Sequence, residues 1–230
     1  MKQKNLVNLF FALLLLLNFG SAFANKDLTQ DSAAENTNSE QGDAINLVRS
    51  TADAVLKKIS ENRDELKADP KLANALVSEL ILPHFDFTRM TRTAMGRYWK
   101  RANESQQSAI VDEFRTLLIR TYSVAVLNYS GQAIEYLPGK ESVGKKSTGK
   151  ESNGTSSLVT VETIVTEADG GPRIPINYRL TETEGAWKVY DVVIDGVSLV
   201  ANYRTSFSGQ IRRGGIDGLI SQLKQINDKG

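Results

Sequence analysis

Two kinds of hydrophobic periodicity divide the chain. Apolar residues recur every three or four positions over 43–63, 70–82 and 104–129, which predicts amphipathic helices, and a short helix is expected over 85–95. Apolar and polar residues then alternate, which predicts strands beginning near positions 134, 158, 174 and 187. Between the first two strands, 140–156 is rich in Gly, Ser and Lys and predicts a flexible hairpin loop.

The period changes within one stretch, 187–204. A strand rich in β-branched and aromatic residues ends at the turn dipeptide Asp195-Gly196, and helical spacing then runs to a stop at Gly214-Gly215. A last helix follows that stop. The order of helices, strands and helices predicts an α+β fold, with helices packed on a strongly twisted antiparallel sheet. A strongly twisted sheet that curls around helices commonly leaves a tapering apolar interior, which side chains either fill or leave open for a ligand.

The N-terminus has the layout of an export signal. Lys2 and Lys4 precede an apolar run over 6–19, and Ala22-Phe23-Ala24 matches the small-x-small cleavage pattern, so 1–24 is expected to be a cleaved signal peptide of a periplasmic protein. An uncleaved, membrane-retained segment is the alternative. Residues 25–42 are polar and predict a disordered lead, which leaves 43–228 as a single domain.

Composition excludes several chemistries. The chain has no Cys and one His, so thiolate nucleophiles, Cys-ligated metals and multi-His metal sites are excluded, and we expect no metal and no cofactor. The 28 Lys and Arg residues nearly balance the 27 Asp and Glu residues, which gives no support for a nucleic-acid partner.

Large apolar side chains on the inward faces of these elements are candidate walls of the cavity. The two helices over 85–129 supply one side, the strands another, and the helix after 198 the floor. Core filling uses the same residue types and is the alternative at each position. The candidates for contact with an apolar ligand are Phe85, Phe87, Met90, Phe114, Leu118, Tyr122, Val126, Tyr129, Val161, Ile176, Tyr178, Tyr190, Val192, Ile194, Val200, Tyr203 and Phe207.

Basic and aromatic residues are interleaved over 89–101. Such a pattern is typical of a docking surface for anionic head groups or for a partner protein. A solvated helix face is the alternative. The candidate docking residues are Arg89, Arg97, Lys100 and Arg101.

Short segments spread over 43–226 share their order and spacing with one known family. They include Leu82-Pro83, GRYWKRA at 96–102, positions 107–114, 118–122 and 129–132, WKVYDV at 187–192, DGVSLV at 195–200, and GGIDGLI at 214–220 followed by Leu223. Through these segments the chain resembles the MlaC family, also called the toluene-tolerance family. The polar lead 25–42 and the long loop 140–156 depart from the family pattern.

The resemblance implies a cone-like, nuclear-transport-factor-like α+β fold with an internal apolar cavity. It also implies a periplasmic phospholipid carrier that performs no chemistry. Such carriers shuttle lipid between an inner-membrane ABC transporter with an MCE-domain ring and an outer-membrane lipoprotein–porin complex. Their activity maintains the lipid asymmetry of the outer membrane.

Two other functions stay open from the residues themselves. One is an enzyme acting on a small apolar ligand, with Asp86, Asp191, Asp195 and Tyr190 as candidate acid–base groups. Against it, each carboxylate has a structural interpretation: Asp86 as a helix cap, Asp191 at a strand edge and Asp195 in a turn. The other is a periplasmic adaptor with a solid core that binds only proteins.

Overall fold

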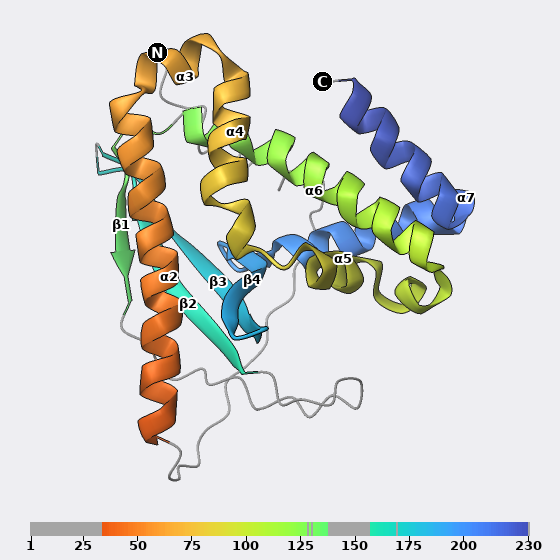
Figure 1. Cartoon of the computed structure of the whole chain (residues 1–230), viewed down its shortest axis with the longest axis horizontal. Coiled ribbons are helices and arrows are strands. Elements are labelled where there is room, and N and C mark those ends of the chain that lie inside the picture. Colours follow the sequence, from red (N-terminus) through yellow and green to blue (C-terminus); the bar gives the residue numbers. More distant parts are fainter. Residues whose placement is uncertain (1–33, 128, 130, 138–156, 169, 230) are drawn as a thin grey trace.

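The computed structural model describes residues 34–127, 129, 131–137, 157–168 and 170–229 (Figure 1). The expected signal peptide, the first part of the polar lead and the loop 140–156 lie outside the described residues. Of the described helices, none is both long and apolar enough to cross a membrane.

Helices make up the first half of the described chain. The Asp69 carboxylate caps α4 by accepting from the backbone N–H of Lys71 at 2.9 Å, next to Pro70. Asn103 and Gln106 form the reciprocal capping box that starts α6. The elements are α2 (Ala34–Glu61), α3 (Arg63–Ala68), α4 (Pro70–Leu80), η1 (Leu82–His84), α5 (Phe87–Met95), η2 (Gly96–Arg101) and α6 (Glu104–Leu127).

The first helix is longer than the sequence pattern indicates. It was expected to begin at Asp43, but α2 begins at Ala34, so residues 34–42 of the predicted disordered lead are helical. These residues are polar but include good helix formers, and extending an existing helix by one residue is far easier than nucleating a new one. Residues 25–33 of the lead are not among the described residues.

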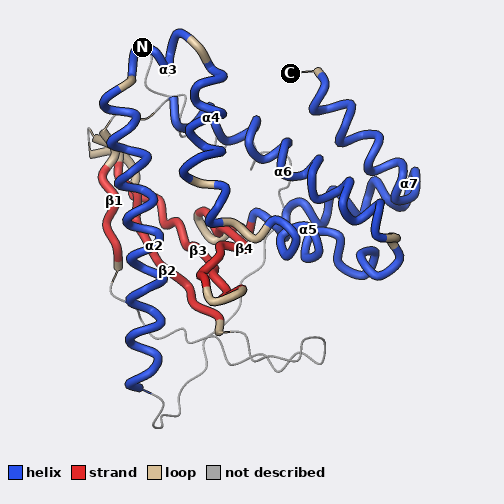
Figure 2. Tube along the Cα trace, in the orientation of Figure 1, coloured by secondary structure: helices blue, strands red, loops and turns tan. Residues whose placement is uncertain are grey.

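The strands form one antiparallel meander in the order β1-β2-β3-β4-β5 (Figure 2). The expected order of helices and then strands is therefore confirmed, and the fold is α+β with an open antiparallel sheet. A β-bulge shifts the register between Arg179 and Leu180, so alternation along β4 is interrupted near Tyr190. The strands are β1 (Ala133–Tyr136), β2 (Leu158–Thr166), β3 (Arg173–Thr183), β4 (Ala186–Ile194) and β5 (Val197–Ser198).

Helices cover both faces of this sheet. On one face, Ala44 and Val48 of α2 pack on Val161, Leu180 and Val189, and α2 crosses in front of the strands in Figure 1. On the other face lie α5 and the start of α7 (Leu199–Asp228). Helix α6 packs against α4, α5 and α7 in a separate helical layer.

A buried carboxylate joins the sheet to α7. Asp191 on β4 accepts hydrogen bonds from Arg179 at 2.9 Å, from the Ser198 hydroxyl at 2.7 Å and from the Val200 N–H at 3.1 Å. It was expected at a strand edge. Its strand partner is Arg179 of β3, and β5 pairs with β4 only at Val193 and Ile194, yet Asp191 is 3% exposed. The alternation of apolar and polar residues cannot reveal such a position, because a buried polar side chain there breaks the pattern it depends on.

Helix α7 changes direction at the predicted Gly214-Gly215 stop. Gly215 has φ 70° and ψ −173°, a conformation that is essentially restricted to glycine, whereas Gly214 continues the helix. A Cβ added at either glycine would meet no atom within 4 Å. Backbone conformation alone therefore distinguishes the two positions.

Substituting the two glycines separately tests this kink. We expect Gly215→Ala to lower the free energy of unfolding by about 1–3 kcal/mol, because alanine is strained at this φ and ψ. Gly214→Ala is the matched control and should be neutral, or stabilising by up to about 1 kcal/mol, because it sits in a helix. Urea denaturation measures both. Equal effects of the two substitutions would contradict the kink.

Candidate functional site

The apolar interior of the helical layer is built around three aromatic rings. Phe114 of α6 lies edge-on to Tyr203 and Phe207 of α7, with ring centroids 4.8 Å and 5.1 Å away. Edge-to-face packing of this kind adds stability beyond the buried area. The structure brings together here ten of the predicted cavity residues: Phe85, Phe87, Met90, Phe114, Leu118, Tyr122, Tyr190, Val200, Tyr203 and Phe207.

A second apolar cluster lies between α2 and the sheet. Strand register places Val161, Tyr178 and Val192 in one row across this face. The next row holds Tyr136, Thr163, Ile176 and Ile194, in which all but Thr163 are half-buried. Half-buried apolar side chains in two adjacent rows leave a face that is only partly covered by protein.

The sequence led us to expect one slot between the long helix and the sheet, and the structure differs. Of the residues predicted for the two sides of that slot, Phe114, Leu118 and Tyr122 belong to the helical cluster. Val161, Tyr178 and Val192 belong to the sheet cluster, and Ile176 and Ile194 to neither of these two. Tyr190 packs in the helical cluster and not in the sheet cluster with Tyr178 and Val192, because the β-bulge interrupts the alternation of side chains at this point. Tyr129 packs with α2–α4, and its hydroxyl donates to the Gln132 carbonyl at 3.3 Å. The side chain of Val126 lies outside the described residues.

Phe85 is the residue at which the two clusters meet. It packs against both, and its ring stacks with that of Phe87 at a centroid distance of 5.9 Å. Its backbone forms a parallel bridge with Val189, and the Asp86 N–H donates to the Val189 carbonyl at 2.9 Å. The segment between η1 and α5 is thereby held against β4, which fixes the Phe85 ring between the layers.

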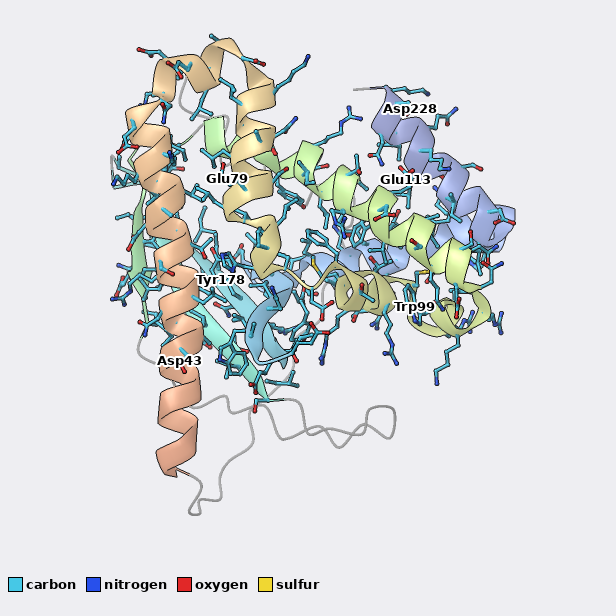
Figure 3. All side chains as sticks on the ribbon, viewed as in Figure 1. Asp43, Glu79, Trp99, Glu113, Tyr178 and Asp228 are labelled. Carbon is cyan, nitrogen blue, oxygen red and sulfur yellow. The ribbon has the colours of Figure 1, made fainter. Side chains whose placement is uncertain are left out.

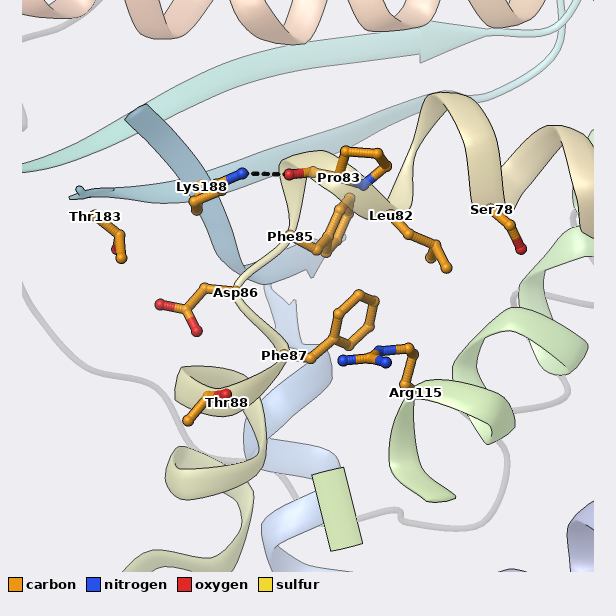
Figure 4. Close-up of a pocket in the computed structure, with 10 residues that line it drawn as sticks. All are labelled: Ser78, Leu82, Pro83, Phe85, Asp86, Phe87, Thr88, Arg115, Thr183 and Lys188. Carbon is orange, nitrogen blue, oxygen red and sulfur yellow. Dashed lines mark hydrogen bonds between the residues drawn. The ribbon is translucent and has the colours of Figure 1, made fainter. Parts of the chain in front are cut away.

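A surface pocket of about 420 Å³ opens beside Phe85 (Figure 4). Its apolar part is Leu82, Pro83, Phe85 and Phe87, and Lys188 donates a hydrogen bond to the Pro83 carbonyl. The Arg115 guanidinium lies 5.2 Å from the Phe87 ring centroid. Arg115 over the Phe87 ring and Lys188 beside Pro83 suit an amphipathic ligand with an anionic group. The remaining lining residues are Ser78, Asp86, Thr88 and Thr183.

Tyrosine hydroxyls are buried in both clusters. Burial raises the pKa of Tyr178 to about 12 and also raises the pKa of Tyr122, Tyr136 and Tyr203, so all four stay neutral at physiological pH. The Tyr122 hydroxyl lies near that of Tyr203, but neither it nor the Tyr136 hydroxyl has a partner with hydrogen-bond geometry in the described structure. These two hydroxyls are able to donate to a polar atom of a ligand.

The predicted docking residues separate into two groups. Arg89 is half-buried: its guanidinium lies 4.6 Å from the Tyr190 ring centroid and donates to the Thr181 hydroxyl at 3.0 Å, so it ties α5 to the sheet. Arg97 and Arg101 are exposed, and their guanidinium groups lie 5.0 Å and 5.7 Å from the centroid of the Tyr98 ring. Lys100 is exposed as well.

The candidate acid–base carboxylates have structural roles. Asp86 caps α5 by accepting from the Arg89 N–H at 2.8 Å, as its interpretation as a helix cap predicted. Asp195 lies in the β4–β5 turn with φ 48°, and Asp191 has the three donors described above. Among the residues that the structure describes, no three His, Cys, Asp or Glu side chains gather as a metal site would require.

Seven of the ten residues that line the pocket were not site candidates from the sequence, and Arg115, Lys188 and Leu82 are among them. Arg115 is one of several charged residues of α6, and Lys188 was noted only within the WKVYDV segment of the family resemblance. Leu82 was noted at a helix end and in the Leu82-Pro83 segment of the family resemblance, but not as a site residue. No local spacing connects positions 82, 115 and 188, so only the folded chain brings them together.

The fold and the site define an α+β protein whose two apolar clusters meet at a cationic, aromatic-lined pocket. A model of the MlaC protein family matches residues 49–225, and the chain therefore belongs to the MlaC family.

Known relatives and a solved structure match most of the chain. It is 26% identical over 181 residues to the intermembrane phospholipid transport system binding protein MlaC of Haemophilus influenzae, covering 78% of this chain and 79% of that protein. It is 24% identical over 192 residues to the toluene tolerance protein ttg2D of Pseudomonas putida, covering 79% and 83%. The structure of a phospholipid-binding protein from Ralstonia solanacearum, in complex with a phospholipid, is similar with a TM-score of 0.70 and 33% identity, over 81% of this chain and 98% of that chain.

Removing two hydroxyl groups separately tests whether the Tyr136 hydroxyl lacks a hydrogen-bond partner. We expect Tyr136→Phe to leave the free energy of unfolding unchanged or slightly raised, because its buried hydroxyl has no hydrogen bond to lose. Thr163→Val, in the same row of the sheet, removes a hydroxyl that donates to the Ile176 carbonyl at 2.8 Å and should lower that free energy by about 1 kcal/mol. Urea denaturation of lipid-free protein makes the comparison. A loss in Tyr136→Phe as large as that in Thr163→Val would show that the tyrosine hydroxyl has a partner.

Proposed function

We propose that this protein is a periplasmic phospholipid carrier that holds acyl chains in its apolar interior and performs no chemistry on the lipid. The observation that carries the proposal is the similarity over nearly the whole length of a protein solved with a phospholipid bound. Membership of the MlaC family and the names of the two bacterial relatives support it. The signal-peptide pattern over 1–24 supports the periplasmic location.

The half-buried sheet face and the pocket supply the surfaces that a carrier needs. Acyl chains would lie along the rows that contain Ile176 and Tyr178, with Phe85 at the junction of the clusters. The head group would remain at the pocket, where Arg115 and Lys188, which both line it, would bind the phosphate. This arrangement separates the apolar and charged parts of one ligand, as the chemistry of a phospholipid requires.

Energetics favour exchange over tight retention. At about 0.8 kcal/mol per CH₂, two chains of about sixteen carbons represent roughly 25 kcal/mol of gross transfer out of water. A bilayer buries the same chains, so moving a lipid from membrane to protein changes this term little. A carrier therefore needs a surface that resembles the bilayer interior, and it does not need a large net affinity.

The proposed carrier works between two membrane assemblies. An inner-membrane ABC transporter with an MCE-domain ring and an outer-membrane lipoprotein–porin complex would exchange lipid with it, and this traffic would maintain the asymmetry of the outer membrane. The structural roles of Asp86, Asp191 and Asp195 give no support to the alternative of an acid–base enzyme.

Native mass spectrometry of the mature protein tests the proposed function directly. Protein purified from the periplasm without detergent should carry a mass adduct that lipid analysis of the ejected ligand identifies as a phospholipid. A mass without adduct, unchanged after incubation with phospholipid vesicles, would contradict the carrier function.

A pair of adjacent substitutions on β3 tests where the lipid lies. Ile176→Trp adds bulk on the half-buried face, and because overpacking costs about 1–3 kcal/mol, lipid retention should weaken about tenfold or more. Asn177→Trp is the matched control, since its side chain points to the opposite face. Lipid content by native mass spectrometry and folding by urea denaturation are measured for both. Equal lipid content in two folded variants would remove this face from the binding site.

A further inference from the structure

Seven exposed cations gather on α5, η2 and the first half of α7, and we call this surface the basic face. Trp99 of η2, which is labelled in Figure 3, shows where the basic face lies. Only Arg97, Lys100 and Arg101 were docking candidates from the sequence. The three α7 arginines were not, because they lie about a hundred positions further along the chain. The members are Arg92, Arg97, Lys100, Arg101, Arg204, Arg212 and Arg213.

Specific contacts join the two halves of the basic face. The Arg204 Nε donates to the Thr93 carbonyl at 2.9 Å, which ties α7 to the last turns of α5. Arg97 donates to the Tyr98 hydroxyl at 3.1 Å. This hydrogen bond lowers the pKa of Tyr98, and the positive charges of Arg97, Arg212 and Arg101 lower it further, which places Arg212 of α7 near η2. The cations are therefore held side by side as one surface.

The two stretches of sequence that carry the basic face contain no acidic residue. None occurs over 87–103 or over 196–216, and the nearest are Asp86, Glu104, Asp195 and Asp217 at the ends of these stretches. Asp217 already accepts a hydrogen bond from Gln106 at 2.7 Å. The other 21 of the 28 cations share the chain with all 27 acidic residues. A nearly neutral protein thus concentrates positive charge on one surface.

We propose that the basic face docks the protein on a bilayer surface that contains anionic phospholipid. Protein interfaces have an apolar, charge-poor centre, whereas the large exposed apolar residues among those described are Leu72, Val197 and Ile226, and none belongs to α5, η2 or 199–213. A cationic surface without an apolar centre suits lipid head groups, where each cation strengthens binding roughly fivefold.

Docking on a bilayer would bring the carrier to a source of lipid, and this inference rests on the proposed carrier function. Helix α5 starts at Phe87 and Thr88, which line the pocket, and it leads directly into η2. The single short helix α5 therefore connects the pocket to the basic face. The attraction itself requires no bound lipid, so docking and carrying can be measured separately.

Vesicle flotation with the mature protein tests the basic face. We expect the protein to bind vesicles of phosphatidylcholine with about one third phosphatidylglycerol, and to bind vesicles of phosphatidylcholine alone only weakly. Binding to the anionic vesicles should fall steeply between about 50 and about 200 mM salt, because salt screens surface charge. The variant with Arg97, Arg101, Arg212 and Arg213 changed to Gln should bind anionic vesicles at least about 100-fold more weakly.

The matched control removes the same charge elsewhere. Lys57, Lys58, Lys67 and Lys71, all exposed on α2–α4, are changed to Gln, and this variant should keep binding within about fivefold of the unmodified protein. Equal loss in both variants, or binding that ignores vesicle charge, would overturn the docking inference and leave the basic face to an acidic protein partner. Protein that carries phospholipid but does not bind anionic vesicles overturns docking alone. Protein that binds vesicles but never carries lipid overturns the carrier function alone.

Discussion

The buried carboxylate of Asp191 determines how the sheet and the last helix meet. A charge inside a protein is costly unless every acceptor site is paired, so the native fold needs Arg179, Ser198 and Val200 in place together. These hydrogen bonds hold the start of α7 against β4 and so determine the direction in which the helix leaves the sheet. That direction carries Tyr203 and Phe207 onto Phe114 and so builds the interior of the helical layer.

Periodicity predicted the elements well because each depends on nearby residues. The capping box at Asn103, the proline start of α4 and the glycine break in α7 are local signals, and all three appear in the structure. The beginning of α2 was missed because helix extension over 34–42 needs no apolar stripe. Tyr190 was placed on the wrong side of the sheet because a β-bulge leaves no mark in the alternation of apolar and polar residues.

The site was harder to predict than the fold, because its parts meet only in three dimensions. The sequence indicated apolar walls, and it correctly identified Phe85, Phe87 and Phe114 as inward residues. It gave no reason to combine Arg115 with Lys188, or Arg97 with Arg212, since no spacing rule links them. Residue type also cannot distinguish a filled core from a partly covered face, because that difference depends on how closely α2 covers the sheet.

The double contact of Phe85 has a consequence for cooperativity. Its ring packs on both the helical cluster and the sheet cluster, and it also lines the pocket. Packed side chains rearrange between discrete positions instead of deforming gradually. A ligand that displaces this one ring must therefore repack both layers in the same step. Empty and loaded forms would then interconvert as whole states, with a single phenylalanine coupling occupancy at the surface to the order of the interior.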